Sequence, residues 1–372
     1  MTADRMSMPS SVDELFDAPE RLVERDRRRL LRAVASAGAQ VRETARLVEE
    51  AGIASLADAG RPRALVVVGR REGAIVGSAL CALAGPDCPV WVIHVPGPDI
   101  PVWVTAADLV LVLSRTGAGA YALTAADEAA RRGCELAGVG AADAPLHARC
   151  AQARAPYVAL PGSREQQASL WSLMTPALLV AGVTGVLPTA LWEPETVADL
   201  LDESALRCGP NQESFANPAK TLALELLDSL PMLVSQGLVA GVAATRAVDQ
   251  LAVLAGLPVA HFRLPEQAVP ARRVLSGPFR AGADDDFFRD RTEDGHRELR
   301  MVCITDASSG DAAVAMRDLR ELADASHVVT SVLQPMSQQA AEQPIRELAE
   351  LIGMVDFAAA YVSLAGDMEA SR

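Results

Sequence analysis

The segment from Leu109 to Gly133 constrains the fold more than any other stretch of the chain. It reads LVLVLSRTGAGAYALTAADEAARRG, an apolar run of strand type followed by a short glycine-containing loop and an alanine-rich helix. This strand–loop–helix layout presents backbone N–H groups and a helix N-terminus to an anion, as phosphate-binding loops do. The loop begins with only two hydroxyl side chains, Ser114 and Thr116, before Gly117. It predicts a phosphate cradle; the alternative is that the hydroxyls only cap the following helix.

Further apolar runs alternate with helical patterns along the rest of the chain. Strands that are apolar throughout and separated by helices indicate parallel sheets covered on both faces. The strands predicted in the first half are 64–69, 90–95, 109–114, 135–140 and 157–160, and the helices that follow are 166–187 and 193–206. In the second half we expect strands at 232–236, 259–263, 299–305 and 328–333, with helices over 239–254, 311–325 and the C-terminus. The fold class is therefore α/β, with two layers of similar plan joined near residue 210.

The pattern divides the chain into three parts. Residues 1–55 contain one or two amphipathic helices over 12–51, residues 56–207 form a first α/β domain, and residues 208–372 form a second. The charged stretch 280–297 within the second domain is predicted to be a solvated loop. The apolar run 170–187 contains Pro176 and is predicted to be a buried helix rather than a membrane span.

Composition excludes several classes of function. A net charge of −14 and a pI near 4.9 argue against a nucleic-acid-binding surface, which needs a basic stripe. The six cysteines are scattered without a CxxC pair, and the five histidines show no metal-ligand spacing. Residues 1–20 have no apolar core of a signal peptide. We therefore expect a cytoplasmic protein with reduced cysteines, no bound metal and no membrane segment.

Five groups of residues resemble the motifs of one family, the bifunctional phosphoglucose/phosphomannose isomerases, and more closely their actinobacterial TobH-like relatives. The groups are Ser114-Arg115-Thr116-Gly117 with Arg132-Gly133, Asn217-Pro218-Ala219-Lys220 to Ala223, Arg246 with Gln250-Leu251, Leu264-Pro265-Glu266, and Asp356 to Tyr361 with Gly366-Asp367. The resemblance spans about residues 60 to 367. It implies two sugar-isomerase (SIS) domains, each a doubly wound parallel sheet between helices. It further implies a homodimer, a hexose phosphate ligand and no cofactor.

The catalytic positions of that family are not retained. The resemblance places the family's general base at Val253, its ring-opening histidine at Val269 and its arginine at Gln167. An aldose–ketose isomerase must move a proton between two carbons, and valine cannot accept one. These substitutions predict a sugar-phosphate-binding protein that has lost the isomerase residues. The alternative is an active isomerase with a reshaped site.

The candidate phosphate-binding residues belong to two loops. One contains Ser114, Arg115, Thr116 and Gly117, and the other is the stretch from Gly69 to Gly73, Gly-Arg-Arg-Glu-Gly, where the family has Gly-Met-Gly-Gly-Ser. Guanidinium groups suit phosphate, so Arg70, Arg71 and Arg115 are substitutes for the lost polar groups or are exposed loop charges. Glu72 lies in the same stretch, where it either faces a ligand or belongs to a solvated turn.

Three further residues are candidates. If the protein is an isomerase, Glu266 and His261 are the acid/base pair that a reshaped site would use. A single histidine at the start of a strand is more often structural. Lys220, which is the only lysine, would be exposed or would reach an anion from the start of a helix.

Overall fold

The computed structural model describes residues 11–162, 168–188, 192–227, 229–279, 297–335 and 343–369. Gln167 and most of the charged stretch, residues 280–296, lie outside the described residues. The described residues fall into two compact units. The first-sheet unit lies within Ala33–Asp202 and Met336–Glu350, and the second-sheet unit lies within Met1–Arg32, Glu203–Pro335 and Leu351–Arg372.

The first-sheet unit contains a five-stranded sheet with strand order β2-β1-β3-β4-β5, in which every pairing is parallel. Its strands are β1 Ala64–Gly69, β2 Trp91–Val95, β3 Leu109–Ser114, β4 Glu135–Ala141 and β5 Tyr157–Leu160. Every residue of β1 and β3 is buried, as expected of apolar strands covered on both faces. All five strands predicted from the apolar runs are confirmed.

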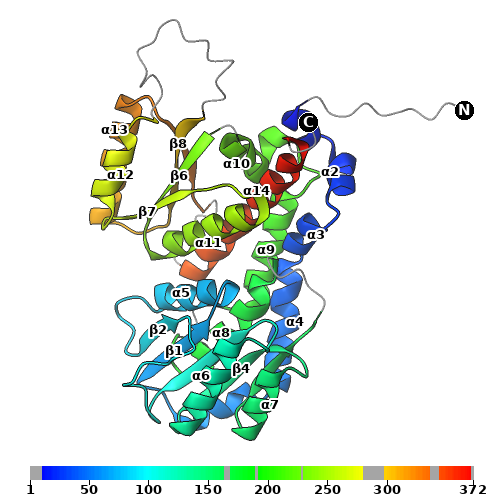
Figure 1. Ribbon diagram of the computed structural model, residues 1–372, viewed down its shortest axis with the longest axis vertical. Coiled ribbons are helices and arrows are strands. Elements are labelled where there is room, and N and C mark those ends of the chain that lie inside the picture. Colours follow the sequence, from blue (N-terminus) through cyan, green and yellow to red (C-terminus); the bar gives the residue numbers. More distant parts are fainter. Residues whose placement is uncertain are drawn as a thin grey trace, which may run out of the picture. The chain divides into compact units, whose positions relative to one another are not determined.

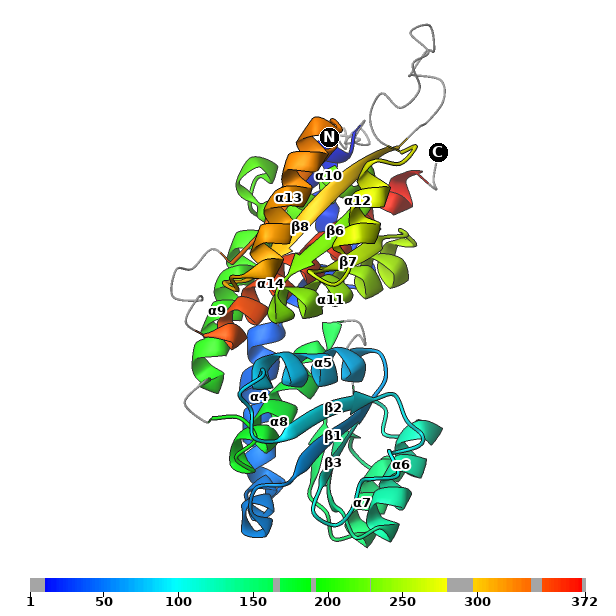
Figure 2. The ribbon, with the colours of Figure 1, turned by 90° about the vertical axis from the view of Figure 1, so that its left-hand side faces the viewer.

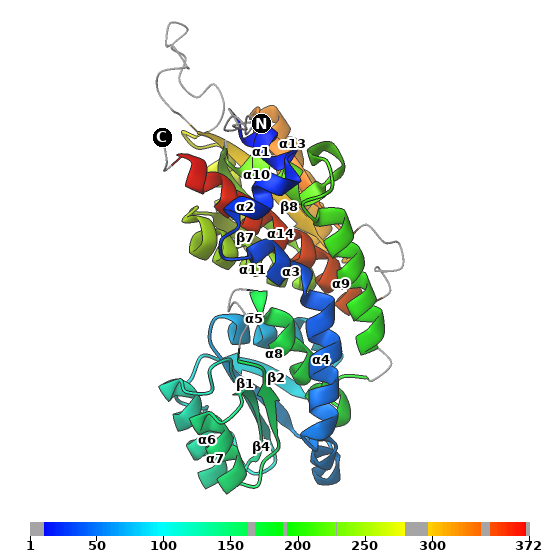
Figure 3. The same cartoon turned by 90° about the vertical axis from the view of Figure 1, so that its right-hand side faces the viewer.

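Helices cover both faces of this sheet. One face carries α4 (Ala37–Glu50), α5 (Glu72–Ala84) and α8 (Leu170–Val183), and the other carries α6 (Ala120–Arg131) and α7 (Pro145–Gln152). Figure 1 shows α6 and α7 beside the sheet, and Figure 3 shows them on the opposite side from α4 and α8. α8 is almost entirely buried despite Pro176, which confirms a buried helix, shorter at both ends than predicted. One hydrophobic core cluster of the unit lies between the sheet and the helices α6 and α7.

The strand order fixes where a ligand is expected in this unit. After β1 the chain crosses to β2 on one side, and from β3 onward it proceeds through β4 and β5 on the other. The direction of winding therefore reverses between β1 and β3. Open parallel sheets bind ligands at this topological switch point, beyond the carboxyl ends of the strands. Two connections meet there: the β1–α5 turn (residues 69–73) and the β3–α6 loop (residues 115–119).

The second-sheet unit repeats this plan with four parallel strands in the order β7-β6-β8-β9. The strands are β6 Ser229–Gln236, β7 Ala260–Leu264, β8 Glu298–Thr305 and β9 Val329–Leu333. α10 (Pro218–Leu227), α11 (Leu238–Ala255) and α14 (Pro344–Glu369) cover one face, and α12 (Ala268–Leu275) and α13 (Asp311–Ala325) cover the other (Figure 2). The four predicted strands are confirmed, with β6 starting earlier than expected.

Two helices of this unit, α11 and α14, are long and apolar enough to cross a membrane by composition alone. Of the apolar window of α14, however, 94% is buried inside the protein. Burial against a sheet accounts for this composition, since a helix that is apolar all round is typical of a protein core.

From residue 11 onward, the described N-terminal region contains four α-helices rather than the one or two predicted. They are α1 Val12–Phe16, α2 Pro19–Arg25, α3 Leu30–Ala35 and α4, and a 3-10 helix, η1 Ile53–Ala59, follows. Pro19 starts α2, and the Asp26 carboxylate starts α3 by accepting the N–H groups of Leu30 and Leu31 at 2.7 and 2.8 Å. The prediction of helical structure in this region is confirmed, but Pro19 and Asp26 start new helices within it and so divide it into shorter ones. α9 (Pro194–Cys208) and the 3-10 helix η4 (Ser214–Ala216) complete the fold.

Candidate functional site

Close packing of glycines shapes the β1–α5 turn. A Cβ on Gly69 would lie 2.8–2.9 Å from backbone atoms of Gly73, a distance that real Cβ atoms do not adopt. A Cβ on Gly73 would lie 3.4 Å from the Cβ and the carbonyl oxygen of Leu113, next to the end of β3. The two predicted glycines therefore let the first turn of α5 pack against the carboxyl ends of both β1 and β3. This packing brings the two predicted loops together at the switch point.

Ser114 supplies the hydroxyl at the end of β3. The residue is 3% exposed, yet its Oγ has no hydrogen-bond partner among the described residues. A Cβ on Gly119, the N-cap of α6, would lie 3.6 Å from this Oγ, so the hydroxyl lies beside the helix N-terminus. Within the described residues the N–H groups of Gly119, Ala120 and Tyr121 likewise donate to no acceptor. A hydroxyl and free N–H groups at the start of a helix form a donor set suited to an anion.

The other predicted loop residues shape the β3–α6 loop itself. The exposed Thr116 accepts the N–H of Ala118 at its Oγ1 over 3.4 Å. Gly117 has φ +61°, and its N–H donates to the carbonyl oxygen of Ser114 at 2.8 Å. A Cβ on Gly117 would overlap the Cβ of Ala144, so no larger residue fits. The N–H groups of Gly117 and Ala118 are thus taken up within the loop, and the donors without an acceptor among the described residues begin at Gly119.

The three arginines near these loops have different surroundings. Arg70 donates to the carbonyl oxygens of Pro96 and Gly97 at 2.8 and 3.1 Å, so it holds a neighbouring loop. Its guanidinium also lies 4.7 Å from the ring centroid of Tyr121. The half-buried Arg115 donates to the carbonyl oxygen of Pro161 at 3.4 Å. Arg71 is exposed, and its guanidinium has no partner among the described residues.

The structure does not pair His261 with Glu266. The Nε2 atom of His261, in β7, lies 2.9 Å from Oγ of the fully buried Ser235, in β6. Burial, followed by the charge of Arg263, lowers the pKa of His261 to about 4. Glu266 is exposed in the turn after β7, and no described hydrogen bond or ion pair reaches it. His261 is therefore a neutral side chain in contact with Ser235. These contacts favour the structural role for His261 over an acid/base role.

Ser235 is not recognisable as the partner of His261 from the sequence, because their contact depends on how β6 and β7 align. The parallel register places Leu233 opposite His261 and Ser235 opposite Arg263. Ser235 is 26 positions from His261, and no local motif joins the two. The feature of the sequence that points to Ser235 is its hydroxyl near the carboxyl end of the mostly apolar strand β6.

Val253 and Val269, the positions of the family's base and histidine, lie on helices of the second-sheet unit. Val253 is on α11 with 52% of its surface exposed, and Val269 is on α12 with 72% exposed. Neither is needed to fill a core, so packing does not explain the valines. Both positions lack a group that can transfer a proton.

A carboxylate fills the corresponding switch point of the second sheet. There the β8–α13 loop (residues 306–310) has the same five-residue length as the β3–α6 loop (residues 115–119). Asp306 Oδ2 accepts the N–H groups of Val239 and Ala240, in the first turn of α11, at 3.0 and 3.2 Å. Its Oδ1 accepts the N–H of Ser308 at 2.9 Å. The end of α11 that would attract an anion is therefore occupied by the chain's own carboxylate.

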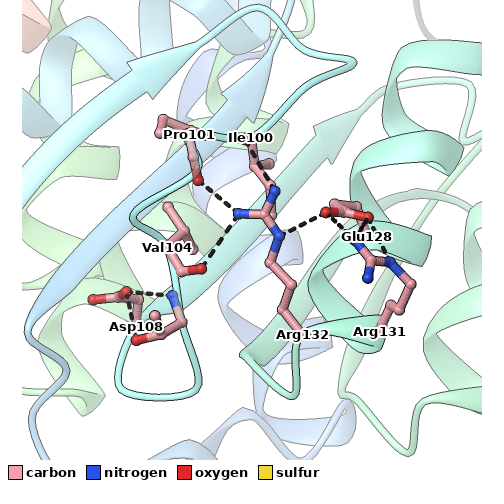
Figure 4. A network of polar contacts seen from close by, with 8 residues as sticks. Ile100, Pro101, Val104, Asp108, Glu128, Arg131 and Arg132 are labelled. Carbon is pink, nitrogen blue, oxygen red and sulfur yellow. Dashed lines mark hydrogen bonds and ion pairs between the residues drawn. The ribbon is translucent and has the colours of Figure 1, made fainter.

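Several residues that resemble the family have structural roles. Arg132 donates to the carbonyl oxygens of Pro101 and Val104 at 2.6 and 3.3 Å, and its Nε donates to Glu128 at 2.6 Å. Figure 4 shows these contacts, which attach the segment before β3 to the end of α6. In the second-sheet unit, Arg246 and Asp356 form a buried ion pair at 2.8 Å. Arg132 and Arg246 therefore join segments that are distant from each other in the sequence.

The expectation that Lys220 is exposed is wrong. Lys220 is fully buried, and its Nζ donates to the carbonyl oxygens of Phe16, Pro210 and Gln212 at 2.5, 2.9 and 2.6 Å. Asn217 starts the same helix by accepting the N–H groups of Ala219 and Lys220, each at 3.0 Å. Lys220 thus binds carbonyl oxygens within the protein and is not available to an anionic ligand.

Comparisons with known proteins agree with this architecture. Residues 215–372 match the family model of the bacterial phospho-glucose isomerase C-terminal SIS domain. The comparison with curated proteins finds no match.

Solved structures match nearly the whole chain at low identity. A hypothetical protein from Thermus thermophilus is 14% identical, with a TM-score of 0.65 over 94% of this chain and 91% of its own. A candidate phosphosugar isomerase from Silicibacter pomeroyi is 13% identical, with a TM-score of 0.59 over 89% and 97%. A candidate tagatose-6-phosphate ketose/aldose isomerase from Clostridium novyi is 12% identical, with a TM-score of 0.57 over 93% and 92%. These likenesses show the fold, and the chain's C-terminal part is similar to a SIS domain of the phosphoglucose isomerase type.

Proposed function

We propose that this protein binds a hexose phosphate at the switch point of the first sheet. The observation that carries the proposal is the donor set at the start of α6. It consists of the buried hydroxyl of Ser114 and the N–H groups of Gly119, Ala120 and Tyr121, none of which has a hydrogen-bond partner among the described residues. A phosphate monoester accepts several hydrogen bonds and carries the negative charge that a helix N-terminus favours.

The class of ligand follows from the relatives. The matched family model is of a phospho-glucose isomerase domain, and four of the matching solved structures are named as candidate phosphosugar isomerases. We further propose that the chain is a TobH-like member of the bifunctional phosphoglucose/phosphomannose isomerase family and forms a cytoplasmic homodimer. The molar mass in solution, measured by light scattering, tests the dimer.

We also propose that the protein does not isomerise its ligand by the family's route. The two family positions within the described residues are exposed valines, Val253 and Val269. Of the two candidates for a reshaped site, His261 is a weak base for this purpose, because its pKa is about 4 and its Nε2 already contacts Ser235. Glu266 has no described contact with His261 that would make the two an acid/base pair. Efficient general bases have pKa values near the working pH.

Ligand-dependent thermal stabilisation tests the binding. Glucose 6-phosphate, mannose 6-phosphate and fructose 6-phosphate are each expected to raise Tm, whereas glucose does not, because a ligand that binds only the folded state stabilises it. The double variant Ser114→Ala/Thr116→Ala should lose this shift. The matched control is Ser308→Ala/Ser309→Ala in the equivalent loop of the second sheet, which should keep it. Absence of a shift with every hexose phosphate would contradict the proposal.

An NMR time course of fructose 6-phosphate in D₂O separates binding from turnover. We expect an unchanged spectrum at high protein concentration. Deuterium at C1, or growth of aldose signals, would show that a base works in this protein. Glu266→Ala and His261→Ala would then identify it.

A further inference from the structure

Arg71 has a backbone conformation that its residue type disfavours. Its φ of 54° and ψ of −119° lie in a region open to glycine, where the Cβ of any other residue is crowded by the backbone. Its guanidinium forms no hydrogen bond, ion pair or ring contact within the described part of the chain that would offset this strain. Residues held in such conformations cluster at ligand sites.

The strain arises from the geometry of the β1–α5 turn. Arg71 is the N-cap of α5 and lies two residues after Gly69, at the tip of a turn narrow enough that Gly69 and Gly73 nearly touch. The chain reverses here from the end of β1 into a helix that packs on Leu113 at the end of β3. Ser114 is the next residue of β3. Arg71 therefore lies in the β1–α5 turn, next to the end of β3 where the Ser114 hydroxyl has no partner among the described residues.

We propose that Arg71 binds the phosphate group of the hexose phosphate and that the strain is retained for this purpose. The inference rests on the proposed function and names the cation of the same site. A guanidinium donates two parallel hydrogen bonds to a phosphate, which an N–H cradle alone does not match. A net charge of −14 opposes the approach of a phosphate dianion, so a local cation is needed. Arg70 and Arg115 donate to neighbouring carbonyl oxygens, whereas the guanidinium of Arg71 has no partner in the described part of the chain.

Substitution by glycine separates strain from binding. Arg71→Gly removes the strain and the guanidinium together, so Tm of the ligand-free protein should rise by a few degrees. The affinity for inorganic phosphate and for glucose 6-phosphate should fall about 10- to 100-fold, the effect of losing charged hydrogen bonds. Arg71→Ala keeps the strain, so it should lose affinity without the rise in Tm. Isothermal titration calorimetry and thermal unfolding, at constant ionic strength, provide both readouts.

The matched control is Arg154→Gly. Arg154 is also an exposed arginine with positive φ, 57°, in the first-sheet unit, and it follows α7 rather than β1. Its replacement should relieve backbone strain and leave phosphate affinity unchanged.

Three results would overturn the inference. If the wild type binds phosphate and Arg71→Gly binds it equally well, Arg71 is not the cation, and the proposed function stands. If Arg71→Gly unfolds at a lower temperature than the wild type, the arginine holds the fold instead. If the wild type binds neither phosphate nor glucose 6-phosphate, the proposed function fails and this inference with it.

Discussion

Two titratable side chains of the second-sheet unit show how burial changes their chemistry. The ammonium of Lys220 is surrounded by three carbonyl oxygens, and its Nζ lies 5.7 Å from the ring centroid of Tyr361. Burial lowers the pKa of Lys220 to about 8. The lysine joins α1, the segment before η4 and α10. These contacts give Lys220 a role in the stability of the folded protein, which accounts for a lysine at this position without a role in ligand binding.

The lowered pKa of His261 predicts a pH-dependent stability. Its pKa is about 4 in the folded protein and 6.5 by reference, so between these values the unfolded chain binds more protons. The free energy of unfolding should consequently fall as the pH decreases from 6.5 to 4, by about 1–2 kcal/mol from this residue, because solvent screening at the partly exposed ring reduces the full effect. Below pH 4 both states are protonated and the contribution stops changing.

Urea unfolding at a series of pH values measures this effect. The His261→Gln variant retains a hydrogen-bonding group for Ser235 but does not titrate, so its stability should decline less over the same range. The difference between the two proteins isolates the histidine from the carboxylates that titrate below it. Parallel stability curves for the wild type and His261→Gln would contradict the assignment.

At the scale of elements, the helices α6 and α11 begin at the switch points of their sheets, one after β3 and the other after β6, and they differ in how their first N–H groups are used. In α6 the N–H groups of Ala120 and Tyr121 have no acceptor within the described residues, whereas in α11 those of Val239 and Ala240 donate to Asp306. A carboxylate at this position satisfies the groups that a helix cannot satisfy itself and favours the helix dipole. At the second switch point the first N–H groups of α11 are therefore used within the protein, whereas at the first switch point those of α6 have no acceptor among the described residues.

Removing the carboxylate should both destabilise the second-sheet unit and create a binding site. Asp306→Ala leaves the N–H groups of Val239 and Ala240 without their acceptor, which we expect to lower the free energy of unfolding by about 1–2 kcal/mol. Sulfate or phosphate should restore part of this loss relative to chloride at equal ionic strength, because either anion can replace the carboxylate.

Denaturant unfolding of Asp306→Ala and Asp311→Ala in each salt makes the measurement. Asp311 is an exposed acid in the first turn of α13, so its variant removes the same charge without freeing those N–H groups. Equal responses of both variants to sulfate would show that Asp306 does not occupy an anion position.

The elements differ in how far the sequence predicts them. β1, β3 and β5 end where their apolar runs end, because a strand buried on both faces has no polar position within it. The position of the β3–α6 loop was predictable for a similar reason, because its glycines and hydroxyls directly follow such a strand. The Asp306 cap and the Ser235–His261 contact were not, because each depends on the alignment of strands that are distant in the sequence. The conformation of Arg71 was also hidden, since its letter gives no sign of a positive φ.

At the scale of the whole molecule, one chain carries two sheets wound in the same sense. The order β2-β1-β3-β4 of the first is repeated as β7-β6-β8-β9 in the second, so each unit has one switch point. Two equivalent switch points would by themselves suggest two ligands per chain. The side chains at the two positions are opposite in charge: Arg71 lies at the start of α5, and the carboxylate of Asp306 lies at the start of α11.

We therefore expect one hexose phosphate to bind per chain. A phosphate dianion at the second switch point would have to displace Asp306 from Val239 and Ala240 and would be repelled by it. Isothermal titration with glucose 6-phosphate should give a stoichiometry of one, and Ser114→Ala/Thr116→Ala should abolish the heat of binding. Asp306→Ala should add a second, weaker binding event for inorganic phosphate without changing the first. Two equal sites in the wild type, or a site that survives the double variant, would show that the second sheet binds ligand despite its carboxylate.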